Sequence, residues 1–373
     1  MQFVLQMFTG TYFGRATNAS LERIRLKLQE TLPLFDVTDV IVGWNTDEAH
    51  NSAILDSIHA HGKKAWLWMP VFSEAPSSEN PDPQIGFSTT PNTRQRSGDE
   101  EDFTFICPSS PYNQGIALRL YDRFFSRLPF DGVFLDKIRQ SSFACGLERA
   151  IGCLCPLCRQ YYLSAGVDPD DVLGCLADNL ASLLPVNRQG AQYRFSDPDM
   201  DAFFAAKAGL ITGAVSSLAD AFRERGLMVG LDVFAPLVAW YVGQDIPTLA
   251  ETADFVKPMF YLRTNSPAGM PFELRSVSDV VGPGTQAALH ALWGAASTDA
   301  AGCAKAQMAA LTGAKSPIWP GFEVNLVPDI CDTNPAYVRE MVKLYEDAGA
   351  EKVVLSWNLL YDTGDNLTAL ARP

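Results

Sequence analysis

Phe130-Asp131-Gly132-Val133-Phe134-Leu135-Asp136 is a short apolar run that ends in a carboxylate. Its aromatic and β-branched residues favour a β-strand. Side chains alternate between the two faces of a strand, so Phe134, Asp136 and Ile138 share one face. We therefore expect a strand whose inward face ends in Asp136.

Seven other runs of this kind occur along the chain, with helical patterns between them. This alternation is typical of βα units around a parallel sheet, and eight such strands close a (β/α)8 TIM barrel. The expected strands are Phe3–Phe8, Val37–Trp44, Ala65–Val71, Gly132–Lys137, Met228–Phe234, Phe255–Leu262, Ile318–Val324 and Val353–Trp357.

An open doubly wound sheet is the alternative α/β fold. It predicts an early glycine-rich phosphate loop, and Gly10-Thr11-Tyr12-Phe13-Gly14 lacks the required spacing. The sequence thus favours a single (β/α)8 barrel domain over residues 1–373. Barrel enzymes keep their active sites at the carboxyl ends of the strands, which places Asp136 at the barrel mouth.

Capping residues mark several of the expected helices. Ser20 precedes a helical pattern over Leu21–Leu32, and Asp47 precedes one over Glu48–His61. Near the end of the chain, Thr333 with Pro335 opens a segment that reaches Ala348. These helices follow expected strands, as a barrel requires.

Two connections are much longer than usual, and both follow a strand on the expected catalytic face. The first insertion, at about residues 72–112, is rich in Pro, Ser, Asn and Asp, so we expect it to cover the barrel mouth and limit substrate length. The second insertion, at about residues 140–198, contains a cysteine cluster and a helical stretch.

The composition is that of a globular protein, with 47% hydrophobic residues and a net charge of −14. Scattered basic residues in an acidic chain argue against nucleic acid or an anionic membrane as the main partner. The amino terminus has no basic region followed by a long apolar stretch, so we expect a cytoplasmic protein, or an exported one if a leader has been removed.

Three carboxylates are the candidate catalytic groups: Asp136, Asp232 at the end of the fifth expected strand, and Glu323 at the end of the seventh. Glycosidic hydrolysis requires two carboxyl groups that flank the scissile bond. For Asp136 the structural alternative is an ion pair with Lys137 or Arg139, and for Asp232 it is one with Lys257.

The candidate substrate-binding groups lie at or near the expected strand ends. Aromatic rings pack against the apolar faces of sugars, and buried polar groups orient them. The candidates are Trp44, Trp66, Lys137, Arg139, Lys257, Tyr261, Trp357 and Asn358.

Four motifs together resemble the hypothetical glycosyl-hydrolase-like barrel proteins, distant relatives of the family 18 chitinases. They are Phe130–Asp136, Gly243–Asp245, Lys257–Tyr261 and Leu355–Asn358. Met259 and Tyr261 match the chitinase Met-x-Tyr on the sixth strand. The catalytic Glu of chitinases corresponds to Ile138 here, and an earlier Asp to Phe134, so the resemblance implies a carbohydrate-active barrel whose acid pair lies on other strands.

The second insertion carries Cys145, Cys153, Cys155 and Cys158. The Cys-x-Cys-x-x-Cys core with one thiol upstream predicts a structural, four-coordinate Zn²⁺. Disulfides are the alternative in an exported protein, and free thiols are the third interpretation. The loop resembles one that holds zinc beside the site of some barrel galactosidases, and no organic cofactor is expected.

The leading functional hypothesis is therefore a glycosidase that cleaves an O-glycosidic bond in an oligosaccharide or glycoconjugate. A non-catalytic carbohydrate-binding barrel is the second hypothesis. The third is a lyase or aldolase that forms a Schiff base on Lys257.

Overall fold

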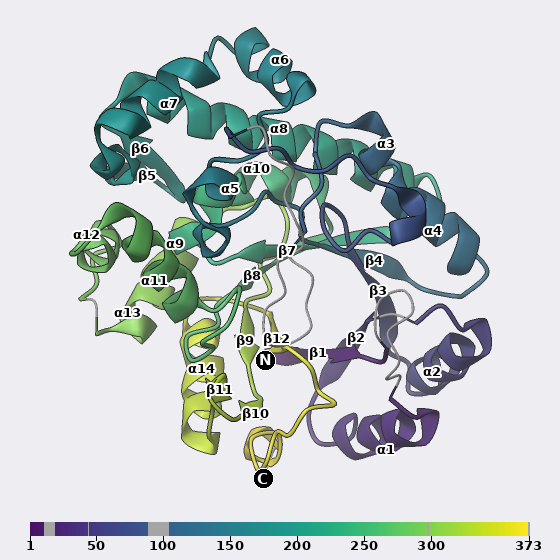
Figure 1. Ribbon diagram of the computed structural model, residues 1–373. Coiled ribbons are helices and arrows are strands. Elements are labelled where there is room, and N and C mark those ends of the chain that lie inside the picture. The colour runs from purple at the N-terminus through teal and green to yellow at the C-terminus, as the bar shows by residue number, and fades with distance from the viewer. Residues whose placement is uncertain (11–18, 44, 89–103, 297, 372–373) are drawn as a thin grey trace.

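The computed structural model describes residues 1–10, 19–43, 45–88, 104–296 and 298–371. Eight parallel strands form a closed barrel in the order β1-β12-β9-β8-β7-β4-β3-β2. Figure 1 shows these strands gathered at the centre with helices around them. The chain therefore has the expected (β/α)8 barrel fold.

The barrel strands begin and end close to the expected positions. Strand β8 ends earlier than expected, at Met259, and β9 is shorter than expected mainly at its start, at Gly321; Met259 with Gly321 is the pair between the two strands. The eight strands are β1 Gln2–Phe8, β2 Val37–Gly43, β3 Lys64–Pro70, β4 Gly132–Asp136, β7 Met228–Phe234, β8 Phe255–Met259, β9 Gly321–Glu323 and β12 Lys352–Ser356.

Helices follow the strands and cover the outside of the barrel (Figure 1). The helices on the barrel wall are α1 Leu21–Thr31, α2 Glu48–Ala60, α4 Ile116–Phe124, α8 Pro198–Arg223, α11 Met270–Val281, α12 Thr285–Leu292, α13 Ala300–Ala310 and α14 Pro335–Asp347. Ser20 and Asp47 cap α1 and α2 as expected. The cap of α14 is Asn334 instead of Thr333, because the Asn334 side chain accepts from the Tyr337 amide.

Short elements fill the connections. The small helices are α3 Pro111–Gln114, α5 Leu147–Ile151, α6 Pro156–Ser164, α7 Pro169–Asp178, α9 Pro236–Ala239 and α10 Ile246–Leu249. The two hairpins are β5 Pro185–Gln189 with β6 Gln192–Phe195, and β10 Leu326–Val327 with β11 Cys331–Asp332.

Large inward side chains beside glycines fill the barrel interior. A Cβ at Gly132 would lie 2.5 Å from the Trp66 ring, and one at Gly230 would lie 2.4 Å from the Phe255 ring. Phe255 stacks on Trp319 with ring centroids 3.8 Å apart. The interior is thus a packed core. The polar residues of the site lie in its layer nearest the carboxyl ends of the strands.

Helix α8 is long and apolar enough to cross a membrane by length and composition. However, 61% of its most apolar window is buried, and it packs against β7 and the second insertion. This burial is what a core helix of a barrel wall shows.

Both insertions lie on the face formed by the carboxyl ends of the strands. The first joins β3 to α4, and its residues 89–103 lie outside the described residues, so its role over the mouth stays a prediction. The second joins β4 to α8, and its helices α6 and α7 project at the top of Figure 1.

Candidate active site

Asp136 is the last residue of β4 and is half-buried. Its Oδ2 accepts a hydrogen bond of 3.0 Å from Nε1 of Trp68, and its Oδ1 accepts one of 2.5 Å from the Lys137 amide. Each carboxylate oxygen therefore has an N–H donor. The two bonds fix the orientation of the carboxylate.

Asp232 lies beside Asp136 in the barrel. Strand β4 pairs with β7 so that Leu135 faces Leu231, and the next position in this register places Asp136 next to Asp232. Adjacent strands are about 4.8 Å apart, and both side chains share the inward parity. The sheet register thus brings two carboxylates together at the barrel mouth.

Burial gives Asp232 a different character from Asp136. Its side chain is 2% exposed, and its Oδ1 has no hydrogen-bond partner among the described residues. Burial raises the pKa of Asp232 to about 8; Lys257 opposes this shift, and the negative charge of Asp136 adds to it. Asp232 can therefore hold a proton at neutral pH.

Lys257 links Asp232 to the opposite side of the barrel. Its Nζ lies 3.1 Å from Asp232 Oδ2, 3.1 Å from Gln6 Oε1 and 2.6 Å from the Tyr261 hydroxyl. A Cβ at Gly321 would come within 2.2 Å of the Lys257 side chain, so this lysine passes through space that only a glycine leaves open. These three acceptors fix the position of the Lys257 Nζ.

Tyr261 lies within electrostatic reach of all three candidate carboxylates. Burial raises its pKa well above the ordinary value, and the negative charges of Asp232, Asp136 and Glu323 raise it further. The Tyr261 hydroxyl therefore stays protonated.

Glu323 is fully buried at the end of β9. Its Oε1 accepts a hydrogen bond from the Arg263 amide, in the connection that follows β8. Burial raises the pKa of Glu323 to about 7, although hydrogen bonds from the backbone and from Tyr337 of α14 oppose the shift. These contacts tie Glu323 to a loop and an outer helix, whereas Asp232 lies close enough to Asp136 for that charge to raise its pKa.

The structure does not bring every candidate to the mouth. Trp66 is 2% exposed, its Nε1 donates to Asp39, and it packs edge to face on Phe255, so it belongs to the barrel core. The side chain of Asn358 accepts from the Phe8 and Leu360 amides and so holds the chain after β12. Trp44 lies outside the described residues.

Lys137 and Arg139 are buried by contacts within the protein. Lys137 forms an ion pair with Glu74 of the first insertion. The guanidinium of Arg139 lies between two rings, 4.5 Å from the centroid of Phe105 and 4.3 Å from that of Phe234. Arg139 therefore joins the first insertion to the end of β7, a role that its sequence neighbours do not reveal.

Trp357 is half-buried directly after β12, and it contacts Tyr361 edge to face at 5.1 Å. Its indole N–H has no hydrogen-bond partner among the described residues. Three tryptophans were predicted to bind substrate. Among those that the structure describes, Trp357 has a partly exposed ring near the strand ends, whereas Trp66 is buried.

Two residues of the site are absent from the expected set. Trp68 donates to Asp136, and Gln6 accepts from Lys257. The alternation of side chains along β3 could have predicted that Trp68 lies in the site. Trp66 and Trp68 share the inward face of this strand, and Trp68 lies nearer its carboxyl end. No local signal points to Gln6, since its partner lies 251 residues away in the chain.

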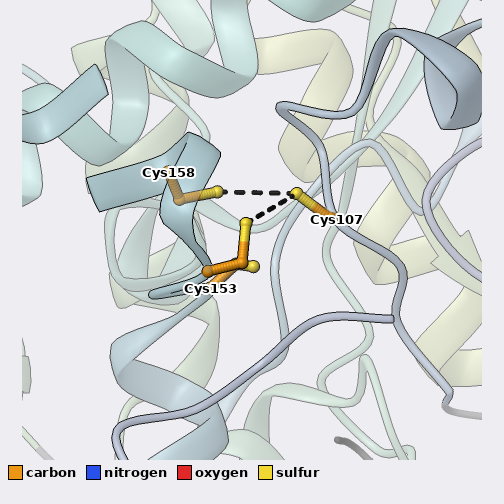
Figure 2. Close-up of side chains that lie close together, drawn as sticks. Cys107, Cys153 and Cys158 are labelled. Atoms are coloured by element: carbon orange, nitrogen blue, oxygen red, sulfur yellow. Dashed lines mark hydrogen bonds between the residues drawn. The ribbon is translucent and has the colours of Figure 1, made fainter. Parts of the chain in front are cut away.

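Four buried thiols form a cluster between the two insertions: Cys107, Cys153, Cys155 and Cys158. Figure 2 shows Cys107 on one segment facing Cys153 and Cys158 on another. Cys145 was the expected fourth thiol and is not part of the cluster. The spacing within the second insertion could not reveal Cys107, because the first insertion delivers it from a distant part of the sequence.

The geometry of the cluster fits a metal ion. All four sulfur atoms lie within 4.8 Å of one another, and Cys107 Sγ lies 3.4 Å from Cys155 Sγ and 3.6 Å from Cys158 Sγ. A tetrahedral site with metal–sulfur bonds of about 2.3 Å has sulfur atoms about 3.8 Å apart. A disulfide needs about 2.05 Å, so these thiols are not bonded to one another.

The backbone around the cluster supports the same geometry. The Ile85 amide approaches Cys153 Sγ at 3.5 Å, and the Leu154 amide donates to the Ile85 carbonyl at 2.7 Å. Gln140 Oε1 accepts from the Cys153 amide at 2.6 Å. The sulfur ligands are thus held by both insertions, as outer contacts hold the ligands of metal sites.

Comparison with solved structures identifies the fold family of the barrel. No family model and no curated protein matches the sequence. The glycoside hydrolase domain of PgaB (BpsB) from Bordetella bronchiseptica superposes with a TM-score of 0.60 at 12% identity, over 98% of this chain and 94% of that one.

Two further structures share the architecture. They are α-L-fucosidase isoenzyme 2 from Paenibacillus thiaminolyticus (TM-score 0.53, 12% identity, 99% of this chain and 47% of that one) and the catalytic domain of β-amylase from Paenibacillus polymyxa (TM-score 0.52, 9% identity, 99% and 95%). The resemblance to glycosyl-hydrolase barrels is thereby confirmed for the fold, and the chain has the (β/α)8 barrel architecture of these hydrolases.

Proposed function

We propose that this protein is a glycosidase that cleaves an O-glycosidic bond in an oligosaccharide or glycoconjugate through Asp136 and Asp232. The observation that carries the proposal is the register of β4 and β7, whose last pair, Leu135 with Leu231, directly precedes Asp136 and Asp232, together with the effect of the Asp136 charge on Asp232. A barrel fold hosts many chemistries, so the fold of the structural neighbours supports the proposal without deciding it.

The two carboxyl groups have different surroundings. Asp136 has an N–H donor on each oxygen and serves as the nucleophile or base. Asp232 is buried with a raised pKa and serves as the general acid that protonates the leaving oxygen. Glycosidases separate the roles of two carboxyl groups through their surroundings in this way. Lys257 binds Asp232 and is itself held by Tyr261, and Trp357 offers an aromatic surface to the sugar.

The pH dependence of turnover follows from Asp232. Because its folded-state pKa is raised to about 8, the acid form is present at neutral pH and is lost as the pH rises through that value. We expect kcat to fall about tenfold for each pH unit above about 8. A profile of kcat against pH measures this fall. If an Asp232→Asn variant is active and shows the same fall at high pH, the general acid is another group.

The lyase hypothesis has no support from the surroundings of Lys257. A Schiff-base amine must lose its proton before it attacks a carbonyl. The Nζ of Lys257 is fully buried and lies within hydrogen-bond distance of three oxygen atoms, so a carbonyl substrate would have to displace these contacts to reach it. Borohydride trapping with carbonyl substrates should therefore leave Lys257 unmodified.

A screen of aryl glycosides tests the proposal. Release of the aryl group by the wild-type protein, and its loss in Asp136→Asn, is the expected result. If no glycoside is cleaved but oligosaccharides bind in calorimetric titration, the protein is a carbohydrate-binding barrel. If no glycoside is cleaved and no oligosaccharide binds, the proposal that the protein acts on carbohydrate is wrong.

We also propose that Cys107, Cys153, Cys155 and Cys158 hold a structural Zn²⁺. Four thiolates at tetrahedral spacing are the donor set that zinc prefers in structural sites. A four-coordinate site has no open position for water or substrate, so the metal takes no part in the chemistry at Asp136. Its role is to join the two insertions beside the barrel mouth.

A further inference from the structure

We infer that Gln244 is a positioning residue: its side-chain amide joins the chain at the ends of β4 and β7 and so sets the spacing between Asp136 and Asp232. The inference rests on the proposed function, in which these two carboxyl groups act together. Gln244 is the middle residue of the Gly243–Asp245 motif, for which the proposed function gives no role.

The backbone pairing between β4 and β7 stops just before the two carboxyl groups. Leu135 and Leu231 form the last pair of the ladder, and Asp136 and Asp232 are the next residues of the two strands. The ladder therefore fixes the distance between the strands on one side of these residues. A second connection is needed beyond them if their spacing is to be fixed from both sides.

Gln244 supplies this second connection. Its Oε1 accepts a hydrogen bond of 2.8 Å from the Phe234 amide, and its Nε2 donates one of 3.4 Å to the Ile138 carbonyl. Phe234 lies two residues after Asp232, and Ile138 lies two residues after Asp136. The side-chain amide thus links the positions that the ladder register would place opposite each other. The two carboxyl groups lie between the ladder and this link.

The chemistry of an amide side chain suits this link. Phe234 offers an N–H and Ile138 offers a carbonyl, so the bridging group must both accept and donate. Gln244 is only 2% exposed, so water competes little for these two bonds. If β4 and β7 moved apart, at least one buried polar group would lose its partner at a cost in free energy. The link therefore favours the observed spacing over a wider one.

The turn that carries Gln244 is itself anchored. Gly243 has a φ of 84°, which glycine adopts without strain, and a Cβ there would lie 3.1 Å from the Lys207 carbonyl oxygen of α8. The Val242 carbonyl accepts a hydrogen bond of 3.0 Å from the Gln140 amide, in the segment after β4. The backbone on which Gln244 is mounted is thus held against α8 and against the second insertion.

The spacing of the two carboxyl groups matters for the proposed reaction. Glycosidases that retain the anomeric configuration hold them about 5–5.5 Å apart, and inverting enzymes hold them about 6.5–9.5 Å apart. A shift of about 1 Å in a catalytic group can lower the rate about 100-fold. A residue that holds β4 and β7 together can therefore control kcat without contacting the substrate.

Two substitutions at Gln244 test the link. Gln244→Met keeps nearly the same length and removes both hydrogen bonds, whereas Gln244→Asn keeps an amide that is one methylene too short to reach both partners. We expect each variant to lower kcat about 10- to 100-fold, with KM within about threefold of wild type. Wild-type kcat in Gln244→Asn, or losses expressed mainly in KM, would overturn the inference.

Gln307→Met is the matched control. Gln307 of α13 is also fully buried, and its Oε1 accepts a hydrogen bond of 2.8 Å from the Leu237 amide, in the same connection after β7. Its Nε2 donates to the Cys303 carbonyl of its own helix. We expect Gln307→Met to lower the melting temperature as Gln244→Met does, but to leave kcat unchanged. Equal losses of kcat in both variants would assign the effect to a loosened connection and overturn the inference.

The pKa of Asp232 reports the spacing without any measurement of turnover. The charge of Asp136 on β4 raises this pKa, and that of Lys257 on β8, which also binds the Tyr261 hydroxyl, lowers it. If β4 moves away from β7, the repulsion from Asp136 weakens. The pKa of Asp232, raised to about 8 in the wild-type protein, should therefore fall in Gln244→Met and stay unchanged in the control variant. Carbon NMR of isotope-labelled aspartate measures it.

Crystal structures keep this test separate from the test of glycosidase activity. The distance between the carboxyl carbons of Asp136 and Asp232 should be larger in Gln244→Met than in the wild-type protein. If this distance and the pKa of Asp232 are both unchanged, the inference fails even if the protein is a glycosidase. If both respond as expected but the wild-type protein cleaves no glycoside, the proposed function fails and the positioning role stands.

Discussion

Asp136→Asn is expected to lower turnover by about two to four orders of magnitude, because it removes the negative charge required of a nucleophile or base. The amide has nearly the shape of the carboxylate but only one acceptor oxygen. Since Trp68 and Lys137 each donate an N–H to Asp136, one of them would face the new NH₂ group. The measurement is kcat on a glycoside that the wild-type protein cleaves, together with titration of the sugar to show that binding survives.

Trp68→Phe is the control that separates charge from orientation. It removes one donor to Asp136 and keeps the carboxylate, so we expect a loss of only about tenfold in kcat. Near wild-type turnover by Asp136→Asn on a verified substrate would exclude Asp136 as the catalytic carboxylate. Trp68→Phe would then have no reason to lower turnover.

The second carboxylate is identified by comparing two further variants. Asp232→Asn should reduce turnover far more than Glu323→Gln, because Asp232 adjoins Asp136 whereas Glu323 is bound to the Arg263 amide. The sequence placed both at strand ends and could not choose between them. The choice depends on the register between β4 and β7, strands that are separated by the whole second insertion.

The fold was predictable because its signals are local. Each strand is a short run of apolar or β-branched residues, and the caps at Ser20 and Asp47 mark the starts of α1 and α2. The start of β9 was less predictable, since the strand pairs over few residues and Trp319, just before it, packs in the core. A residue's position along a strand indicates whether it lies near the mouth, but not what contacts it.

Trp66 illustrates the limit of such reasoning within a single strand. Trp66 lies near the start of β3 and its inward side chain is part of the packed interior. Trp68 lies two residues later on the same face, nearer the barrel mouth, and it donates a hydrogen bond to Asp136. Lys137 and Arg139 show the limit between strands. Their partners Glu74 and Phe105 come from the first insertion, which has no periodic pattern from which contacts could be inferred.

Loss of the proposed zinc is expected to destabilise the second insertion more than it alters the barrel. Metal analysis should find one zinc per chain, and Cys107→Ser or Cys155→Ser should abolish its binding, because a thiolate that closes the tetrahedron is lost. Structural zinc binding contributes directly to folding free energy. We expect these variants to melt about 5–10 °C lower and to be cleaved faster by protease within residues 140–198.

Cys145→Ser is the matched control for this prediction. Cys145 lies in the same insertion, eight residues before Cys153 in the sequence, but outside the cluster. Its replacement should leave zinc content and melting temperature unchanged. Because Cys107 alone comes from the first insertion, Cys107→Ser should also loosen the segment around Phe105, which packs on Arg139 at the barrel mouth. A chain that keeps its zinc in Cys107→Ser and loses it in Cys145→Ser would instead support the four ligands that local spacing predicts.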